Sequence, residues 1–173
     1  MILPFGDKQP QLGARVFVAP SADIIGQVIL GDDTSIFYQC VLRGDINSIT
    51  VGARSNIQDH CTLHVASDLS VTLGEDVSVG HGCIIHACTI GDRVLVGMGS
   101  IIMDGTTVGE DCLIAAGSLL VKGKVFEPGS LIMGNPARTI RKLTPEEIAG
   151  LAKLAAKYIM VKDVYLQTRA WPG

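Results

Sequence analysis

Aliphatic residues recur at every sixth position along most of the chain, and a small residue follows most of them four positions later. The period is unbroken from Val18 to Leu42; after a slip, an insertion and the loss of one residue, the last run extends from Ile84 to Ile132. An α-helix repeats its apolar face every 3.6 residues, so a period of six excludes a helix. Three hexads, about 18 residues, suit one turn of a coil of short parallel strands that pair with the turns above and below. The pattern therefore predicts a mainly β chain folded as a parallel β-helix.

A helix signal follows the repeat. Thr144 can act as the N-cap, Pro145 suits the first turn, and Glu147 stands at the capping-box position. Apolar residues then recur on one face of the segment: Ile148, Leu151, Leu154, Ala155, Tyr158 and Ile159. We therefore expect an amphipathic helix that continues to about Gln167.

The chain thus divides into two predicted parts. Residues 1–143 are expected to form the β-helix domain, with a short N-terminal lead-in. Residues 144–173 are expected to form a C-terminal α-helix region that packs on the prism or on a neighbouring subunit, with a loose end at residues 171–173.

Composition narrows the class of protein. Hydrophobic residues make up 47% of the chain but aromatic residues only 5%, so the core must consist of Val, Ile, Leu and Ala. The net charge is −3 and no run of Lys or Arg occurs, which argues against nucleic acid as a partner. The start of the chain lacks a secretory signal, and no stretch approaches the roughly 20 apolar residues of a membrane span. We therefore expect a cytoplasmic protein that does not enter a membrane.

All five cysteines fall on the small position of the hexads: Cys40, Cys61, Cys83, Cys88 and Cys112. Their number is odd and no C-x-x-C occurs, so neither a disulfide framework nor a cysteine metal cluster is expected. A thiol at such a position behaves as a small hydrophobic group. The cysteines are therefore predicted to point into the prism.

All four histidines lie in one short segment: His60, His64, His81 and His86. His64 follows the aliphatic residue Leu63 by one position and His86 follows Ile84 by two, which puts both on the outer surface of one face. His81 lies on the preceding face. Exposed histidines are often ordinary surface residues, and this alternative stays open; His60, at a turn position, fits a surface or supporting residue best.

The spacing of the histidines constrains any shared metal site. Five residues of strand cover roughly 16 Å, whereas ligand nitrogens lie about 2 Å from a metal ion. His64 and His86 can therefore chelate one ion together, while His81 is better placed to serve another subunit. A closed ring of three chains satisfies both requirements. The register therefore predicts a homotrimer with metal sites at its interfaces.

The repeat over residues 11–137 resembles the hexapeptide-repeat proteins, which fold as left-handed parallel β-helices. The segments R-G-D at 43–45, N-I-Q-D at 56–59, His64, and the pair His81 and His86 resemble the signature of the γ-class carbonic anhydrase family of trimeric β-helices. This resemblance implies that His64 and His86 bind a metal ion from one subunit and His81 from its neighbour. The ion would be Zn²⁺, Fe²⁺ or Co²⁺, and bound hydroxide would convert CO2 to bicarbonate reversibly.

The resemblance also implies roles for five other residues. Gln58 would orient the hydroxide or the substrate. Arg43 and Asp59 would pair across the subunit interface, with Asp45 supporting that pair. Tyr158 matches a tyrosine near the site in some relatives, although a core or interface position explains it equally well.

One departure from the family keeps other functions open. The archaeal archetype carries proton-shuttling glutamates where this chain has Ile46 and, in the insertion after His64, only Asp68. Hydration could therefore be slow. The alternatives are an acyl-CoA thioesterase or an acyltransferase on the same fold, and a non-catalytic binding module in which the metal only clamps the trimer.

Overall fold

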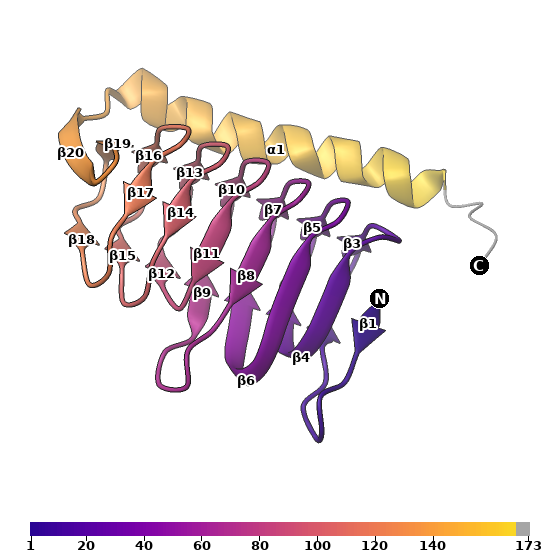
Figure 1. Ribbon diagram of the computed structural model, residues 1–173. Helices are drawn as coiled ribbons and strands as arrows, with labels where there is room; N and C mark the ends of the chain where they lie inside the picture. Colours follow the sequence, from indigo (N-terminus) through magenta and orange to yellow (C-terminus); the bar gives the residue numbers. More distant parts are fainter. Residues whose placement is uncertain (169–173) are drawn as a thin grey trace.

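The computed structural model describes residues 1–168, in which short parallel strands wind into a β-helix with three faces (Figure 1). The first face consists of β3 (Phe17–Val18), β5 (Ser35–Ile36), β7 (Asn56–Ile57), β10 (Ser78–Val79), β13 (Leu95–Val96), β16 (Leu113–Ile114) and β19 (Ser130–Gly134). The second face consists of β1 (Ile2–Leu3), the first parts of β4 (Asp23–Leu30) and β6 (Val41–Val51), β8 (Thr62–His64), β11 (Ile84–His86), β14 (Ile101–Ile102) and β17 (Leu119–Leu120). The third face consists of β2 (Gln11–Leu12), the last parts of β4 and β6, β9 (Val71–Leu73), β12 (Thr89–Ile90), β15 (Thr107–Val108) and β18 (Val125–Phe126).

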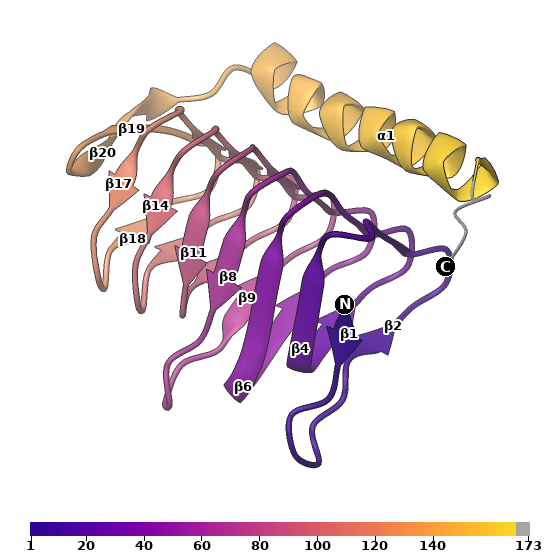
Figure 2. The same ribbon diagram turned by 45° about the vertical axis from the view of Figure 1, so that its right-hand side comes forward.

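The C-terminal segment turns back on this prism. β20 (Ala137–Lys142) pairs antiparallel with β19, and α1 (Pro145–Gln167) then runs from the β20 end of the prism to the β3 end, alongside the first face (Figures 1 and 2). The predicted fold class, a mainly β parallel β-helix with a C-terminal α-helix, is confirmed.

The core is a stack of aliphatic side chains, as the hexads predict. The predicted register of the hexads is wrong at one coil, the one that contains Ile84 and Ile85. Ile85 is fully buried and pairs with Leu63, whereas Ile84 is 46% exposed. The missing residue therefore lies after Ile85 rather than before Ile84, a shift that the adjacent isoleucines conceal in the sequence. As a result His86 stands directly beside His64.

The small hexad positions do more than fill space. All five cysteines are buried and free, as predicted. Several side chains at these positions also donate a hydrogen bond to a backbone carbonyl at a corner: Ser100 Oγ to Gly97 at 2.7 Å, and Cys61 Sγ to Gly80 at 3.1 Å. Buried carbonyls at the turns thereby gain partners that the strand ladders do not supply.

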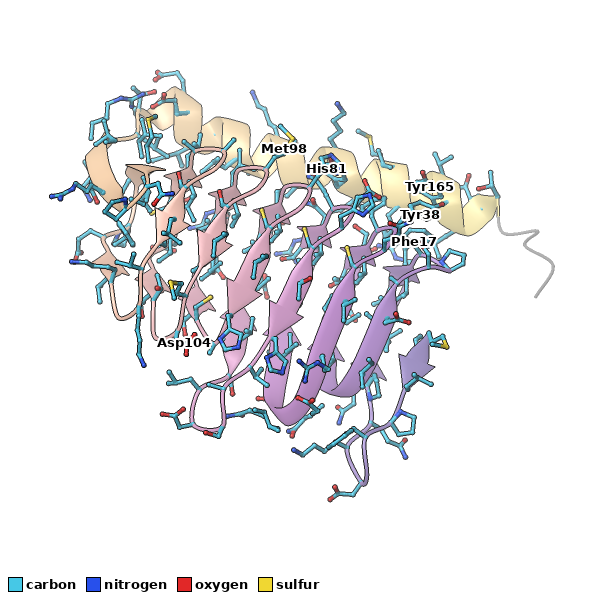
Figure 3. The ribbon with its side chains drawn as sticks, viewed as in Figure 1. Phe17, Tyr38, His81, Met98, Asp104 and Tyr165 are labelled. Atoms are coloured by element: carbon cyan, nitrogen blue, oxygen red, sulfur yellow. The ribbon has the colours of Figure 1, made fainter. Side chains whose placement is uncertain are left out.

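Helix α1 begins with the predicted capping box. The N–H of Glu147 donates to Thr144 Oγ1, and the N–H of Thr144 donates to the Glu147 carboxylate. An aromatic cluster holds the other end of the helix: Phe17 stacks on Tyr165 with a centroid distance of 4.9 Å, and Tyr38 meets Tyr165 edge-on (Figure 3). Although aromatic residues are few, they gather where the helix meets the prism.

A buried lysine also anchors α1. The ammonium of Lys162, with no exposed area, donates to Asp163 Oδ1 at 2.6 Å, to Asp33 Oδ1 at 2.8 Å and to the carbonyl of Arg15 at 3.2 Å. Asp33 also pairs with the Arg15 guanidinium, and these contacts hold the pKa of its carboxyl below the ordinary value. Nothing in the sequence pattern predicted this cluster.

Two predictions about the organisation of the chain are not tested by the structure. The predicted loose end at residues 171–173 lies outside the described residues, and the division of the chain at residue 143 stays a prediction. Across residues 1–168, no helix combines the length and the apolar character needed to cross a membrane.

Candidate metal centre

His64 and His86 lie side by side on the second face. They occupy equivalent positions of the neighbouring strands β8 and β11, and their side chains are partly buried. The Nδ1 atom of His64 is 3.1 Å from the Nε2 atom of His86. The hexad pattern holds both rings on the outer surface because Leu63 and Ile85, one position earlier, point into the core.

A carboxylate flanks each ring of this pair. Asp45 Oδ1 lies 3.3 Å from His64 Nε2, and Asp104 Oδ1 lies 2.6 Å from His86 Nδ1. The hydrogen bond with His86 holds the pKa of the Asp104 carboxyl below its ordinary value. The four side chains form one continuous chain of polar contacts across β6, β8, β11 and the corner after β14.

Asp45 makes a further contact, with Arg43. The guanidinium of Arg43 pairs with Asp45 Oδ2, and the N–H of Ile46 donates to Asp45 Oδ1. Burial alone would raise the pKa of the Asp45 carboxyl, but these hydrogen bonds hold it below its ordinary value. Asp45 therefore faces His64 as a carboxylate.

His81 lies at a different edge of the prism. It follows β10 at a corner, and its Nδ1 atom is 2.9 Å from Asp59 Oδ2. Figure 3 shows His81 at the edge beside α1, whereas Asp104, the partner of His86, lies at the opposite edge. Within residues 1–168 of a single chain, no group of three or more His, Cys, Asp or Glu side chains is arranged to hold a metal ion.

Gln58 and Tyr158 lie on the His81 side. Both line a pocket of about 340 Å³ between α1 and the first face, together with His81 and the apolar residues Met98 and Leu154. Gln58 is buried, and its Nε2 donates to Asn56 Oδ1 at 3.2 Å. Burial, followed by the nearby charge of Asp59, raises the pKa of Tyr158. The pocket thus combines apolar lining residues with the polar side chains of Gln58, His81 and Tyr158.

The remaining predicted residues have partners within the chain. Arg43 contacts Asp45, while Asp59 contacts His81 and accepts the N–H of Tyr38 at 3.1 Å. A pairing of Arg43 with Asp59 between subunits stays a prediction. His60 is exposed at a corner with a left-handed φ of 62°, as its turn position suggests.

The histidine pair fits a divalent metal ion. Two nitrogens 3.1 Å apart, each about 2.0–2.1 Å from an ion, subtend roughly 100° at that ion, which is close to tetrahedral. The opposite nitrogen of each ring faces a carboxylate, the arrangement usual for histidine ligands of metals. Sequence reasoning missed Asp104, although the coil period of about 18 residues would have brought position 104 next to His86.

Comparison with known proteins identifies the family to which the chain belongs. Residues 87–122 match the model of the bacterial transferase hexapeptide (six repeats). Protein YrdA of Escherichia coli is 49% identical over 173 residues, covering 96% of this chain and 94% of that protein. The carbonic anhydrase of Geobacillus kaustophilus is 38% identical over 165 residues, covering 95% of this chain and 91% of that protein. The chain belongs to the γ-class carbonic anhydrase family.

This γ-class carbonic anhydrase-like chain also resembles solved structures with transferase names. A hexapeptide transferase family protein from Anaplasma phagocytophilum superposes with a TM-score of 0.90 and 43% identity, over 95% of this chain and 98% of that one. The names of the relatives thus divide between two activities, which the chemistry of the site must distinguish.

Proposed function

We propose that the protein is a metal-dependent carbonic anhydrase that interconverts CO2 and bicarbonate in the cytoplasm. One observation carries this proposal. Each of the three histidines has one ring nitrogen next to a different carboxylate: His64 next to Asp45, His81 next to Asp59, and His86 next to Asp104. The other nitrogen of each ring is therefore available to bind an ion. Three neutral imidazoles suit Zn²⁺, Co²⁺ or Fe²⁺. When bound, such an ion supplies a hydroxide nucleophile at neutral pH by lowering the pKa of a water towards about 7.

The proposal requires three copies of the chain. His64 and His86 supply two nitrogens on the second face, while His81 lies at another edge and would complete the site of a neighbour. Exposed apolar side chains beside the pair support such an interface. Ile84 is 46% exposed, Ile101 39% and Met103 40%, on β11, on β14 and just after β14. Apolar patches of this kind mark contact surfaces between proteins.

The side chains of the pocket have distinct tasks in this proposal. The amide of Gln58 would orient the attacking oxygen or the substrate, and the hydroxyl of Tyr158 would supply a second polar group to the pocket. Asp45 holds the ring of His64, and Asp59 holds that of His81, so that each ring presents one nitrogen. Arg43 fixes Asp45 within the chain and would meet Asp59 of a neighbour in the trimer. No carboxylate follows Asp45 directly, so proton release and hence turnover would be slow.

A second candidate is acyl transfer or thioester hydrolysis. The name of the Anaplasma relative favours it, and a pocket of about 340 Å³ is larger than CO2 requires. The three histidines, each beside its own carboxylate, argue against acyl transfer. An acyl transferase needs one general base rather than a set of metal ligands. A non-catalytic module clamped by metal is the remaining alternative.

The test combines metal analysis with activity. Protein purified without air should contain one Zn²⁺, Co²⁺ or Fe²⁺ per chain and should accelerate CO2 hydration above the buffer rate. His81→Ala should lose both properties, whereas His60→Ala, at an exposed corner in the same segment, should keep both. Hydrolysis of short acyl-CoA substrates without CO2 hydration would favour the second candidate. Bound metal with neither activity would favour the binding module.

A further inference from the structure

Asp104 lies outside the segments of this chain that carry the family resemblance, yet it makes the shortest polar contact with the histidine pair. It lies at the corner after β14, on the coil that follows His86, and its side chain is 30% exposed. Its Oδ1 atom is 2.6 Å from His86 Nδ1. A contact this short with a ring nitrogen requires a hydrogen between the two atoms.

The position of that hydrogen determines what the rest of the pair can do. An ionised carboxylate only accepts hydrogen bonds, so the hydrogen belongs to Nδ1 of His86, and the neutral ring keeps a lone pair on Nε2. Asp45 acts in the same way on Nε2 of His64, which leaves the lone pair of that ring on Nδ1. The two lone pairs then face each other across 3.1 Å. Neutral rings in this arrangement repel unless a cation lies between them.

We propose that Asp104 is the positioning residue of the metal centre, an inference that rests on the proposed function. Its carboxylate holds His86 in the Nδ1–H tautomer and turns Nε2 towards His64, which makes the pair a site for a cation. Asp104 acts only through His86 and needs no contact with substrate.

Metal affinity provides the first test. Zn²⁺ affinity of the full-length protein is measured by competition with a chelator for wild type, Asp104→Ala and Asp104→Asn. Loss of an outer hydrogen-bond partner typically weakens metal binding by about 10–100-fold, so Asp104→Ala should fall in that range. Asp104→Asn keeps an acceptor oxygen without the charge and should lose less. Asp68→Asn removes the same charge from the exposed insertion after His64 and should bind like wild type.

The tautomer provides a second test that needs no metal. Nitrogen-15 shifts of the metal-free protein are recorded near pH 8.5, well above the usual imidazole pKa of about 6.5. His86 should be Nδ1-protonated in wild type and should gain the Nε2–H form in Asp104→Ala, while His60 stays unchanged. An unaltered His86 tautomer together with unaltered Zn²⁺ affinity would overturn the proposal. If wild type bound no metal at all, the proposed function would fail, but the nitrogen shifts would still decide the role of Asp104.

Discussion

Replacing Lys162 with alanine should loosen α1 from the prism. The ammonium is fully buried and has three acceptors, two of them carboxylates. Removing one partner of a buried ion pair costs about 3–5 kcal/mol. In the variant, Asp33 still pairs with Arg15, and the side chain of Asp163 is 41% exposed to solvent, so neither carboxylate is left buried without a partner. We therefore expect a loss at the lower end of that range, about 3 kcal/mol. Lys162→Met fills most of the space without the charge and should cost less.

The effect is local and can be read by hydrogen exchange. Because about 1.4 kcal/mol corresponds to tenfold, the amides of α1 near residue 162 should exchange roughly 100-fold faster in Lys162→Ala, with the β-helix amides unchanged. Tyr158, one turn earlier, lines the pocket, so substrate affinity should fall while metal content stays constant. Lys157→Ala changes an exposed lysine of the same helix and is the matched control. Equal exchange rates in the two variants would refute the idea that the buried ammonium holds the helix.

Three further predictions concern register, pH and metal. Ile85→Ala should cost about 2–5 kcal/mol in denaturant unfolding, and Ile84→Ala clearly less; equal losses would contradict the register. Arg141 and the Thr144 N–H lower the pKa of Glu147 to about 2, so its support of the α1 N-terminus should be complete above pH 4.5 and should disappear as the pH falls towards 2. This loss can be measured as faster hydrogen exchange of the first α1 amides at low pH. In Glu147→Gln the exchange should no longer depend on pH in this way, because the variant has no carboxyl group to protonate. Removing metal with a chelator should lower the thermal midpoint and any hydration activity, and added Zn²⁺ should restore both.

Much of the fold can be predicted from the sequence because each hexad is a local rule. The alternation of one large and one small inward residue leaves few other structures, and the capping residues Thr144 and Glu147 mark the start of α1 within one position. The register at Ile84 and Ile85 was wrong because two adjacent isoleucines satisfy the pattern equally well. Only pairing with the neighbouring coil, Ile85 against Leu63, distinguishes them.

The candidate site was harder to predict, for reasons of distance along the chain. His64 and His86 share a column, which the repeat reveals. Asp104 reaches His86 only through the next coil, and Lys162 reaches Asp33 across 129 positions of sequence. Contacts of this kind depend on how a corner turns a side chain, which the spacing of apolar residues does not encode. The proposed placement of His81 in the same site would depend on a second chain.

Mixing two inactive variants tests the shared site most directly. His81→Ala and His64→Ala, each carrying a different tag, are purified alone and as co-expressed mixed trimers. In each mixed trimer, one of the three interfaces joins an intact His81 to an intact His64–His86 pair, so the purified mixed trimers should hold about a third of the wild-type metal content. Mixed trimers that bind no more metal than either variant alone would contradict a site built from two subunits.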